Sequence, residues 1–89
     1  MARLIFTQQL ARFTPVPQVE TRATSLRAAL EAAFAANPQL RGYVLDEQGH
    51  LRPNVVVFID GRRCAERVLL ADRLTPDTTV YILQALSGG

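Results

Sequence analysis

The sequence contains no lysine and no tryptophan, and it has a single cysteine, Cys64, and a single histidine, His50, among 89 residues. One cysteine cannot form an intramolecular disulfide, and one cysteine with one histidine cannot assemble a Cys/His zinc site. We therefore expect neither a disulfide scaffold nor a bound metal. No nucleophile is paired with a base in this sequence, so no catalytic residues are predicted. Cys64 and His50 are interpreted as an incidental thiol and a turn residue.

Long apolar runs are also missing. Residues 1–12 lack the run of roughly 7 apolar residues that a signal peptide needs, and no stretch reaches the ~18 apolar residues of a membrane span. We expect a cytoplasmic protein without a membrane partner. A chain this short excludes a two-domain enzyme, and its 48% hydrophobic content excludes a disordered chain. We expect a single domain over residues 1–86 and a flexible tail over residues 87–89.

The charges are mixed along the chain. Five arginines accompany two acidic residues in residues 1–44, and five accompany six in residues 45–89, which gives the halves charges of +3 and −1. Only Arg62 and Arg63 are adjacent, so no basic cluster indicates nucleic-acid binding. We expect no nucleic-acid partner and a monomer in the free state. A biased composition is the simplest explanation for the absence of lysine.

The first half of the chain predicts a hairpin followed by a helix. Residues 3–10 favour a strand, and two prolines within residues 13–18 indicate a connection to a short second strand at 19–23. Thr24-Ser25 supplies hydroxyl caps for a helix that runs to residue 36 and stops at Asn37-Pro38. One face of that helix is apolar, through Leu26, Ala29, Leu30, Ala33 and Phe34.

The second half predicts further strands. The pattern assigns no element to residues 40–45, whereas residues 54–59 are the clearest strand and are bounded by the turn Asp60-Gly61. Residues 64–68 are predicted as one short strand, and residues 69–75 as a short helical or looped crossover. The order of hairpin, helix and strands predicts an α+β domain, a β-grasp arrangement with a mixed sheet packed on one main helix.

The last strand, residues 79–86, runs directly into Ser87-Gly88-Gly89. This ending, with segments 51–61 and 74–89, resembles the MoaD/ThiS family of ubiquitin-like sulfur carriers. The resemblance implies a carrier that is not itself an enzyme and binds no cofactor. A ubiquitin-activating-like adenylyltransferase would use ATP to activate Gly89, and a cysteine desulfurase or rhodanese-type protein would supply sulfur. The resulting thiocarboxylate would pass sulfur to an acceptor biosynthetic enzyme.

The chemistry of such a terminus has a physical basis. A carboxylate is a poor electrophile until its oxygen becomes a leaving group, and adenylation achieves this. Because Gly88 and Gly89 carry no side chains, the tail can enter a narrow channel and adopt backbone angles closed to other residues. The activated end is therefore predicted to be Gly89, preceded by Gly88.

Strand alternation predicts where a partner would bind. With Val55, Val57, Ile59, Val80 and Ile82 facing the helix, the intervening residues point to the other side of the sheet. An apolar patch of this kind on a small protein usually marks a binding site. The predicted partner-binding surface consists of Val56, Phe58, Tyr81 and Leu83.

Two alternatives to the sulfur carrier stay open at this stage. The chain could be a ubiquitin-like modifier whose Gly89 is joined to an amine of a target protein, because both roles need the same activated terminus. It could also be a non-covalent β-grasp interaction module. The sequence does not distinguish molybdopterin, thiamine, cysteine or tRNA thiolation as the pathway that receives the sulfur.

Overall fold

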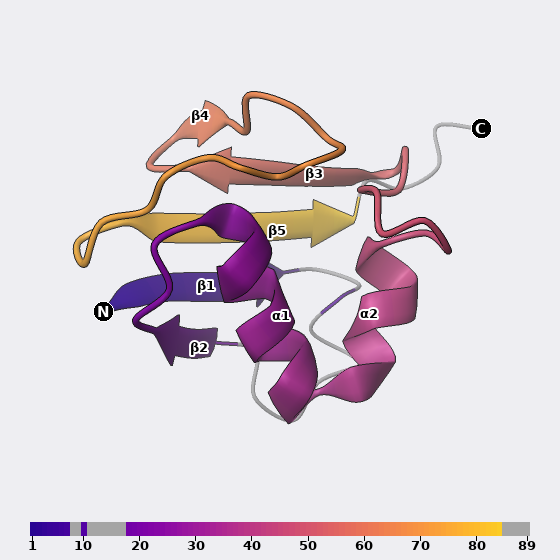
Figure 1. Ribbon diagram of the computed structural model, residues 1–89, viewed down its shortest axis with the longest axis horizontal. Coiled ribbons are helices and arrows are strands. Elements are labelled where there is room, and N and C mark those ends of the chain that lie inside the picture. The colour runs from indigo at the N-terminus through magenta and orange to yellow at the C-terminus, as the bar shows by residue number, and fades with distance from the viewer. Residues whose placement is uncertain (8–9, 11–17, 85–89) are drawn as a thin grey trace.

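The computed structural model describes residues 1–7, 10 and 18–84. Over these residues a single sheet is accompanied by two helices (Figure 1). In chain order the elements are β1 (Ala2–Thr7), β2 (Gln18–Thr21), α1 (Leu26–Ala36), α2 (Pro38–Val44), β3 (Val55–Ile59), β4 (Arg62–Arg63) and β5 (Thr79–Gln84). No helix in the described part of the chain is long and apolar enough to cross a membrane.

The sheet is mixed, as the sequence predicts. Its strand order is β2-β1-β5-β3-β4, with β1 and β5 parallel and the other neighbours antiparallel. The last strand, β5, therefore lies in the middle of the sheet, between β1 and β3. Hydrogen bonding on both sides fixes the position at which β5 ends.

Helix α1 forms where its sequence pattern places it. The Ser25 side chain accepts a hydrogen bond from the Ala28 amide at 3.2 Å, which satisfies one of the free amides of the first turn. The predicted apolar face is buried against the sheet. Asn37 ends the helix, and its amide donates to the carbonyl of Ala33 at 2.9 Å.

Helix α2 is absent from the sequence prediction. Pro38, read as a stop signal for α1, also starts α2, since proline at the first helical position loses no intrahelical hydrogen bond. Leu40 and Val44 lie four residues apart and are both buried. This pair is the single sign of helical periodicity in the segment. One repeat is too little to identify a seven-residue helix from the sequence.

The strand predicted at residues 64–68 is wrong. The short strand lies earlier, at Arg62–Arg63, directly after a tight turn at Asp60 and Gly61, whose φ angles are 51° and 89°. Positive φ at both turn residues is the geometry that matches the twist of a two-residue hairpin. Residues 64–75 form a loop, as the looped alternative for 69–75 anticipated.

The predicted strand phase is confirmed by burial. Both helices lie on the same side of the sheet, where the alternate residues of β1, β3 and β5 are almost completely buried. These inward residues are Ala2, Leu4, Phe6, Val55, Val57, Ile59, Val80 and Ile82. The core that they form with α1 leaves the other face of β3 and β5 without a covering helix among the described residues (Figure 1).

Candidate functional site

The four residues of the predicted binding surface are brought together by the register of β3 and β5. Val56 lies directly opposite Leu83, and Phe58 lies opposite Tyr81. Directly opposed residues on one face have Cβ atoms roughly 4.5 to 5.5 Å apart, so the four side chains form one continuous patch. We call Val56, Phe58, Tyr81 and Leu83 the open face.

The open face is only partly accessible. Tyr81 is 42% exposed, whereas Val56, Phe58 and Leu83 are half-buried. The position of the patch agrees with the strand phase, and its role in binding stays a prediction.

Strand β1 adds residues that the sequence analysis did not identify. Ile5 is paired with Tyr81, and Thr7 with Leu83, because β1 runs parallel beside β5. The alternation of buried Leu4 and Phe6 with Ile5 is visible in the sequence. Nothing in the sequence, however, states that the first strand lies next to the last, so Ile5 could not be assigned to the patch.

The predicted activated end, Gly88 and Gly89, lies outside the described residues. The last described residue of β5 is Gln84, which pairs with Val55 at the start of β3. Leu83 lies at the same end of the sheet and belongs to the open face. The described part of β5 thus ends in the middle of the sheet, beside one edge of the open face.

A loop over residues 64–74 lies close to this end of the sheet. The Arg67 guanidinium donates to the carbonyl of Val55 at 2.6 Å and also to that of Arg52. The carbonyl of Arg67 in turn accepts from the amide of Leu51 at 2.9 Å. Because Val55 is the register partner of Gln84, these contacts hold the loop next to the residue from which the tail departs.

Glu66 fixes the shape of this loop. Its carboxylate accepts hydrogen bonds from the backbone amides of Val68, Leu69 and Ala71 at 2.7 to 3.0 Å. Burial acts to raise the pKa of Glu66, but the hydrogen bonds from these amides outweigh it and hold the pKa below its usual value. Because the folded-state pKa is lowered, the stabilisation is fully present well above the ordinary pKa of 4.5 and is lost as the pH falls through the lower folded-state pKa.

Comparison with known proteins relates this geometry to other folds. No protein-family model matches the sequence, and no curated protein does. SAMP1 from Haloferax volcanii superimposes with a TM-score of 0.82 at 21% identity, covering 99% of this chain and 98% of its own. A chain of the Amycolatopsis orientalis BexX/CysO complex gives a TM-score of 0.83 at 15% identity and covers 100% of both chains. Urm1 from Sulfolobus solfataricus gives 0.71 at 14% identity, covering 92% and 97%.

The chain has a β-grasp fold. Structural similarity at 14% to 21% sequence identity establishes the fold alone. This fold agrees with the one expected from the order of helices and strands in the sequence. Within this β-grasp fold the structure places neither Cys64 nor His50 in a reactive site. His50 lies in the turn where the Asp46 carboxylate accepts its amide at 2.9 Å.

Cys64 is half-buried and packs against the core. Burial first, and the nearby Asp72 carboxylate second, raise the pKa of its thiol. A thiol with a raised pKa is protonated at neutral pH and is a poor nucleophile. Within residues 1–7, 10 and 18–84, no three His, Cys, Asp or Glu side chains come together to hold a metal ion.

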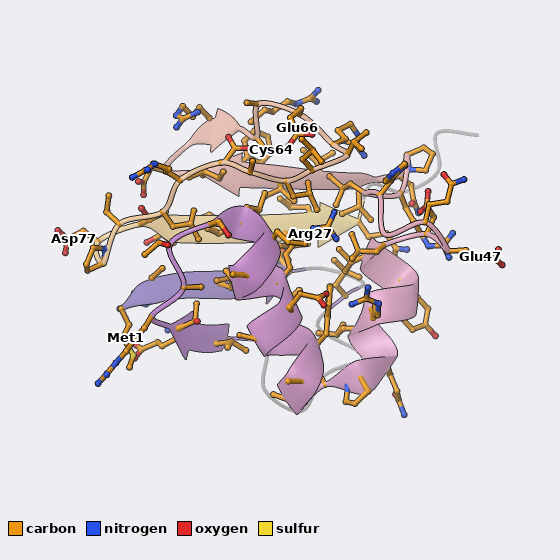
Figure 2. The ribbon with its side chains drawn as sticks, viewed as in Figure 1. Met1, Arg27, Glu47, Cys64, Glu66 and Asp77 are labelled. Atoms are coloured by element: carbon orange, nitrogen blue, oxygen red, sulfur yellow. The ribbon has the colours of Figure 1, made fainter. Side chains whose placement is uncertain are left out.

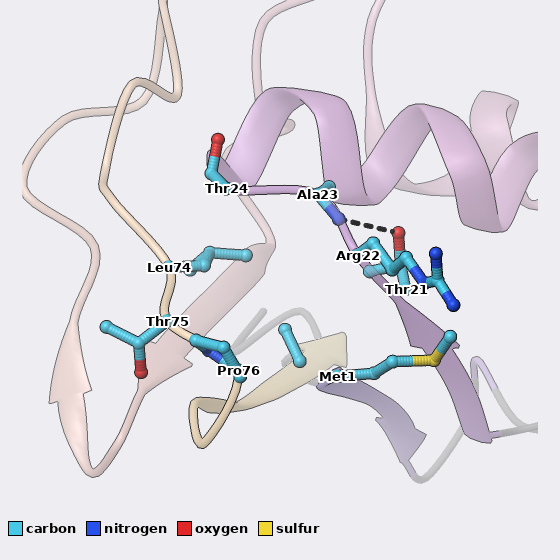
Figure 3. A pocket seen from close by; sticks show the side chains of 9 residues that line it. Met1, Thr21, Arg22, Ala23, Thr24, Leu74, Thr75 and Pro76 are labelled. Carbon is cyan, nitrogen blue, oxygen red and sulfur yellow. Dashed lines mark hydrogen bonds between the residues drawn. The ribbon is translucent and has the colours of Figure 1, made fainter.

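A small, largely apolar cavity of about 240 Å³ lies at the other end of the sheet (Figure 3). Met1, Ala23, Leu74 and Pro76 contribute apolar side chains to its lining. Pro76 precedes the start of β5, so the cavity lies at the end of the strand away from the tail. It does not belong to the candidate site.

Proposed function

We propose that this protein is a sulfur carrier whose Gly89 carboxyl group is adenylated by a ubiquitin-activating-like adenylyltransferase and then converted to a thiocarboxylate. One observation carries the proposal. The central strand β5 is described to Gln84, and the sequence reaches Gly89 only five residues later, after Gly88. The same fold occurs in SAMP1 and in a chain of the BexX/CysO complex.

The proposed chemistry begins with the carboxylate of Gly89. An oxygen of this group attacks the α-phosphorus of ATP, the bond to the β-phosphate breaks, and pyrophosphate leaves. A persulfide sulfur then attacks the acyl carbon of the adenylate and AMP departs, which gives an acyl disulfide. A thiol reduces this disulfide, becomes a disulfide itself, and releases the thiocarboxylate.

The chain contributes a substrate and a docking surface to this sequence, and the partner enzyme contributes catalysis and binds ATP. Gly88 and Gly89 allow the tail to enter a narrow channel. The open face offers an apolar area beside the strand that carries the tail. We place the protein in the cytoplasm as a monomer, where a cysteine desulfurase or rhodanese-type protein supplies the persulfide and a biosynthetic enzyme receives the sulfur.

A ubiquitin-like modifier is the second candidate. An amine of a target protein would attack the same acyl-adenylate, AMP would leave, and an amide would form. The fold is shared with SAMP1, which is a small archaeal modifier protein by name. Both candidates need Gly89 to be activated, and they differ only in the nucleophile.

Mass spectrometry of the protein isolated from its native cells tests the proposal. A mass gain equal to replacement of one oxygen by sulfur, located at Gly89, supports the carrier. Remnants of the tail on lysines of other proteins support the modifier instead. If neither product is detected under any growth condition, both candidate functions are rejected and a non-covalent interaction module is favoured.

A further inference from the structure

Two adjacent apolar side chains project from the loop over residues 64–74. Val68 is 48% exposed and Leu69 is 70% exposed, and Leu69 is the most exposed large hydrophobic side chain in the described part of the chain. The next residue, Leu70, is fully buried and has a φ of 54°. A leucine adopts this left-handed backbone only where the surrounding contacts hold it there.

The pair is held in place by contacts from distant parts of the chain. Besides the three amides bound by Glu66, the Arg27 guanidinium donates to the carbonyl of Val68 at 2.7 Å and to that of Gly49 at 2.8 Å. Arg27 belongs to the first turn of α1 and reaches across to this loop (Figure 2). Polar contacts therefore fix the backbone while Val68 and Leu69 remain exposed. A preorganised apolar contact loses little conformational entropy on binding.

The length of the tail determines what can lie next to this pair. Five residues follow Gln84, and fully extended they span at most about 18 Å. An enzyme that takes Gly89 into its active site must therefore approach the end of β5 closely. Arg67, the neighbour of Val68, is hydrogen-bonded to Val55, the register partner of Gln84. Val68 and Leu69 thus lie near the end of the sheet that an enzyme must approach closely in order to receive the short tail.

We propose that Val68 and Leu69 form a second contact for the adenylating enzyme, separate from the open face, and seat in an apolar depression next to the channel that receives the tail. This inference rests on the proposed function. Two side chains alone are far too small for a stable dimer, since specific interfaces bury about 1,200 Å² or more. Val68 and Leu69 instead supplement an interface in which the tail is already bound.

The test is ATP–pyrophosphate exchange, measured against carrier concentration, with the adenylating enzyme that activates the wild-type protein. Leu69→Asp should raise KM about tenfold or more, as expected when a charge replaces an apolar side chain seated in an apolar depression, and leave kcat nearly unchanged. Val68→Asp should raise KM less, because Val68 is less exposed. The matched control is Ala32→Asp, which adds the same charge on the exposed side of α1 and should leave KM unchanged.

Thermal unfolding must show that each variant is folded, and Leu69→Ser serves as the milder variant if Leu69→Asp is not. An unchanged KM in a folded Leu69 variant overturns the inference and leaves the proposed function intact. A fall in kcat alone also overturns it, because that places Leu69 in the chemical step. Self-association of the wild type that is abolished by Leu69→Asp would assign the pair to a second copy of the chain. If no adenylating enzyme activates the wild type, the proposed function itself fails.

Discussion

The two faces of the sheet use the same strands for different purposes. On the face toward α1, Val57 and Ile82 are almost completely buried and belong to the core. On the opposite face their neighbours Phe58 and Tyr81 are directly paired but retain access to solvent. Because side chains alternate along a strand, adjacent residues have separate environments. The inward set stabilises the fold, and the outward set is free to be selected for binding.

This separation extends to the end of β5. A central strand held on both sides provides a fixed base for the tail. Changes to the tail, the core and the open face should therefore have distinguishable consequences.

Deletion of Gly89 should have the largest effect on activity and almost none on stability. The reacting carboxyl group would then be on Gly88, one residue short of the position that the enzyme's active site requires, so adenylation should fall to background. ATP–pyrophosphate exchange measures this, with urea unfolding as the stability control. Undiminished exchange by the shortened protein would reject activation at Gly89.

Ile82→Ala should have the largest effect on stability. A fully buried isoleucine leaves a cavity when truncated, and the free energy of unfolding should fall by about 2 to 5 kcal/mol. Tyr81→Ala, one residue earlier on the open face, should cost clearly less. Urea denaturation of the two variants measures the difference. Equal losses would mean that the open face is covered in solution.

Phe58→Ala and Leu83→Asp should weaken binding to the adenylating enzyme by more than they reduce stability. Residues at the centre of an interface typically contribute about 2 kcal/mol or more to binding. Titration calorimetry gives the binding free energy, and thermal unfolding of the same samples gives the stability. Ala35→Asp, on the exposed side of α1, is the control for added charge. A large drop in melting temperature without a specific binding loss would place these side chains in the core.

The sequence predicted those parts of the fold that depend on local pattern. The cap at Ser25, the apolar face of α1 and the inward phase of β3 and β5 each follow from period and residue type within one element. The turn at Asp60-Gly61 was also identified, because its residue types match its backbone angles.

Helix α2 was missed because its local pattern is too short, whereas other missed features depend on contacts between distant segments. The loop around Glu66 combines local bonds to the Glu66 carboxylate with a contact from Arg27, some forty residues earlier in the chain. A run such as Val68-Leu69-Leu70 suggests a buried element, whereas here two of the three side chains are exposed. The place of Ile5 beside Tyr81 depends on strand order, which no local pattern encodes.

The last prediction concerns a reaction that should not occur. Conjugation through an amide needs an uncharged amine, and the guanidinium of arginine stays protonated at physiological pH. All ten basic side chains here are arginine, so the N-terminal amine is the only amino group that the chain offers. Whether it acts as carrier or modifier, the protein should form no lysine-linked chains on itself, and each attachment site on a target should hold one copy.

Incubation with the adenylating enzyme and ATP, followed by a denaturing gel and peptide mapping, measures this directly. The control is a variant with one arginine on the exposed surface replaced by lysine, such as Arg62→Lys, which restores an amine. A ladder of self-adducts from the wild type, joined through an internal side chain, would contradict the prediction. It would show that Gly89 is accepted by Cys64 or a hydroxyl group, and the activated end would then have a nucleophile within the chain itself.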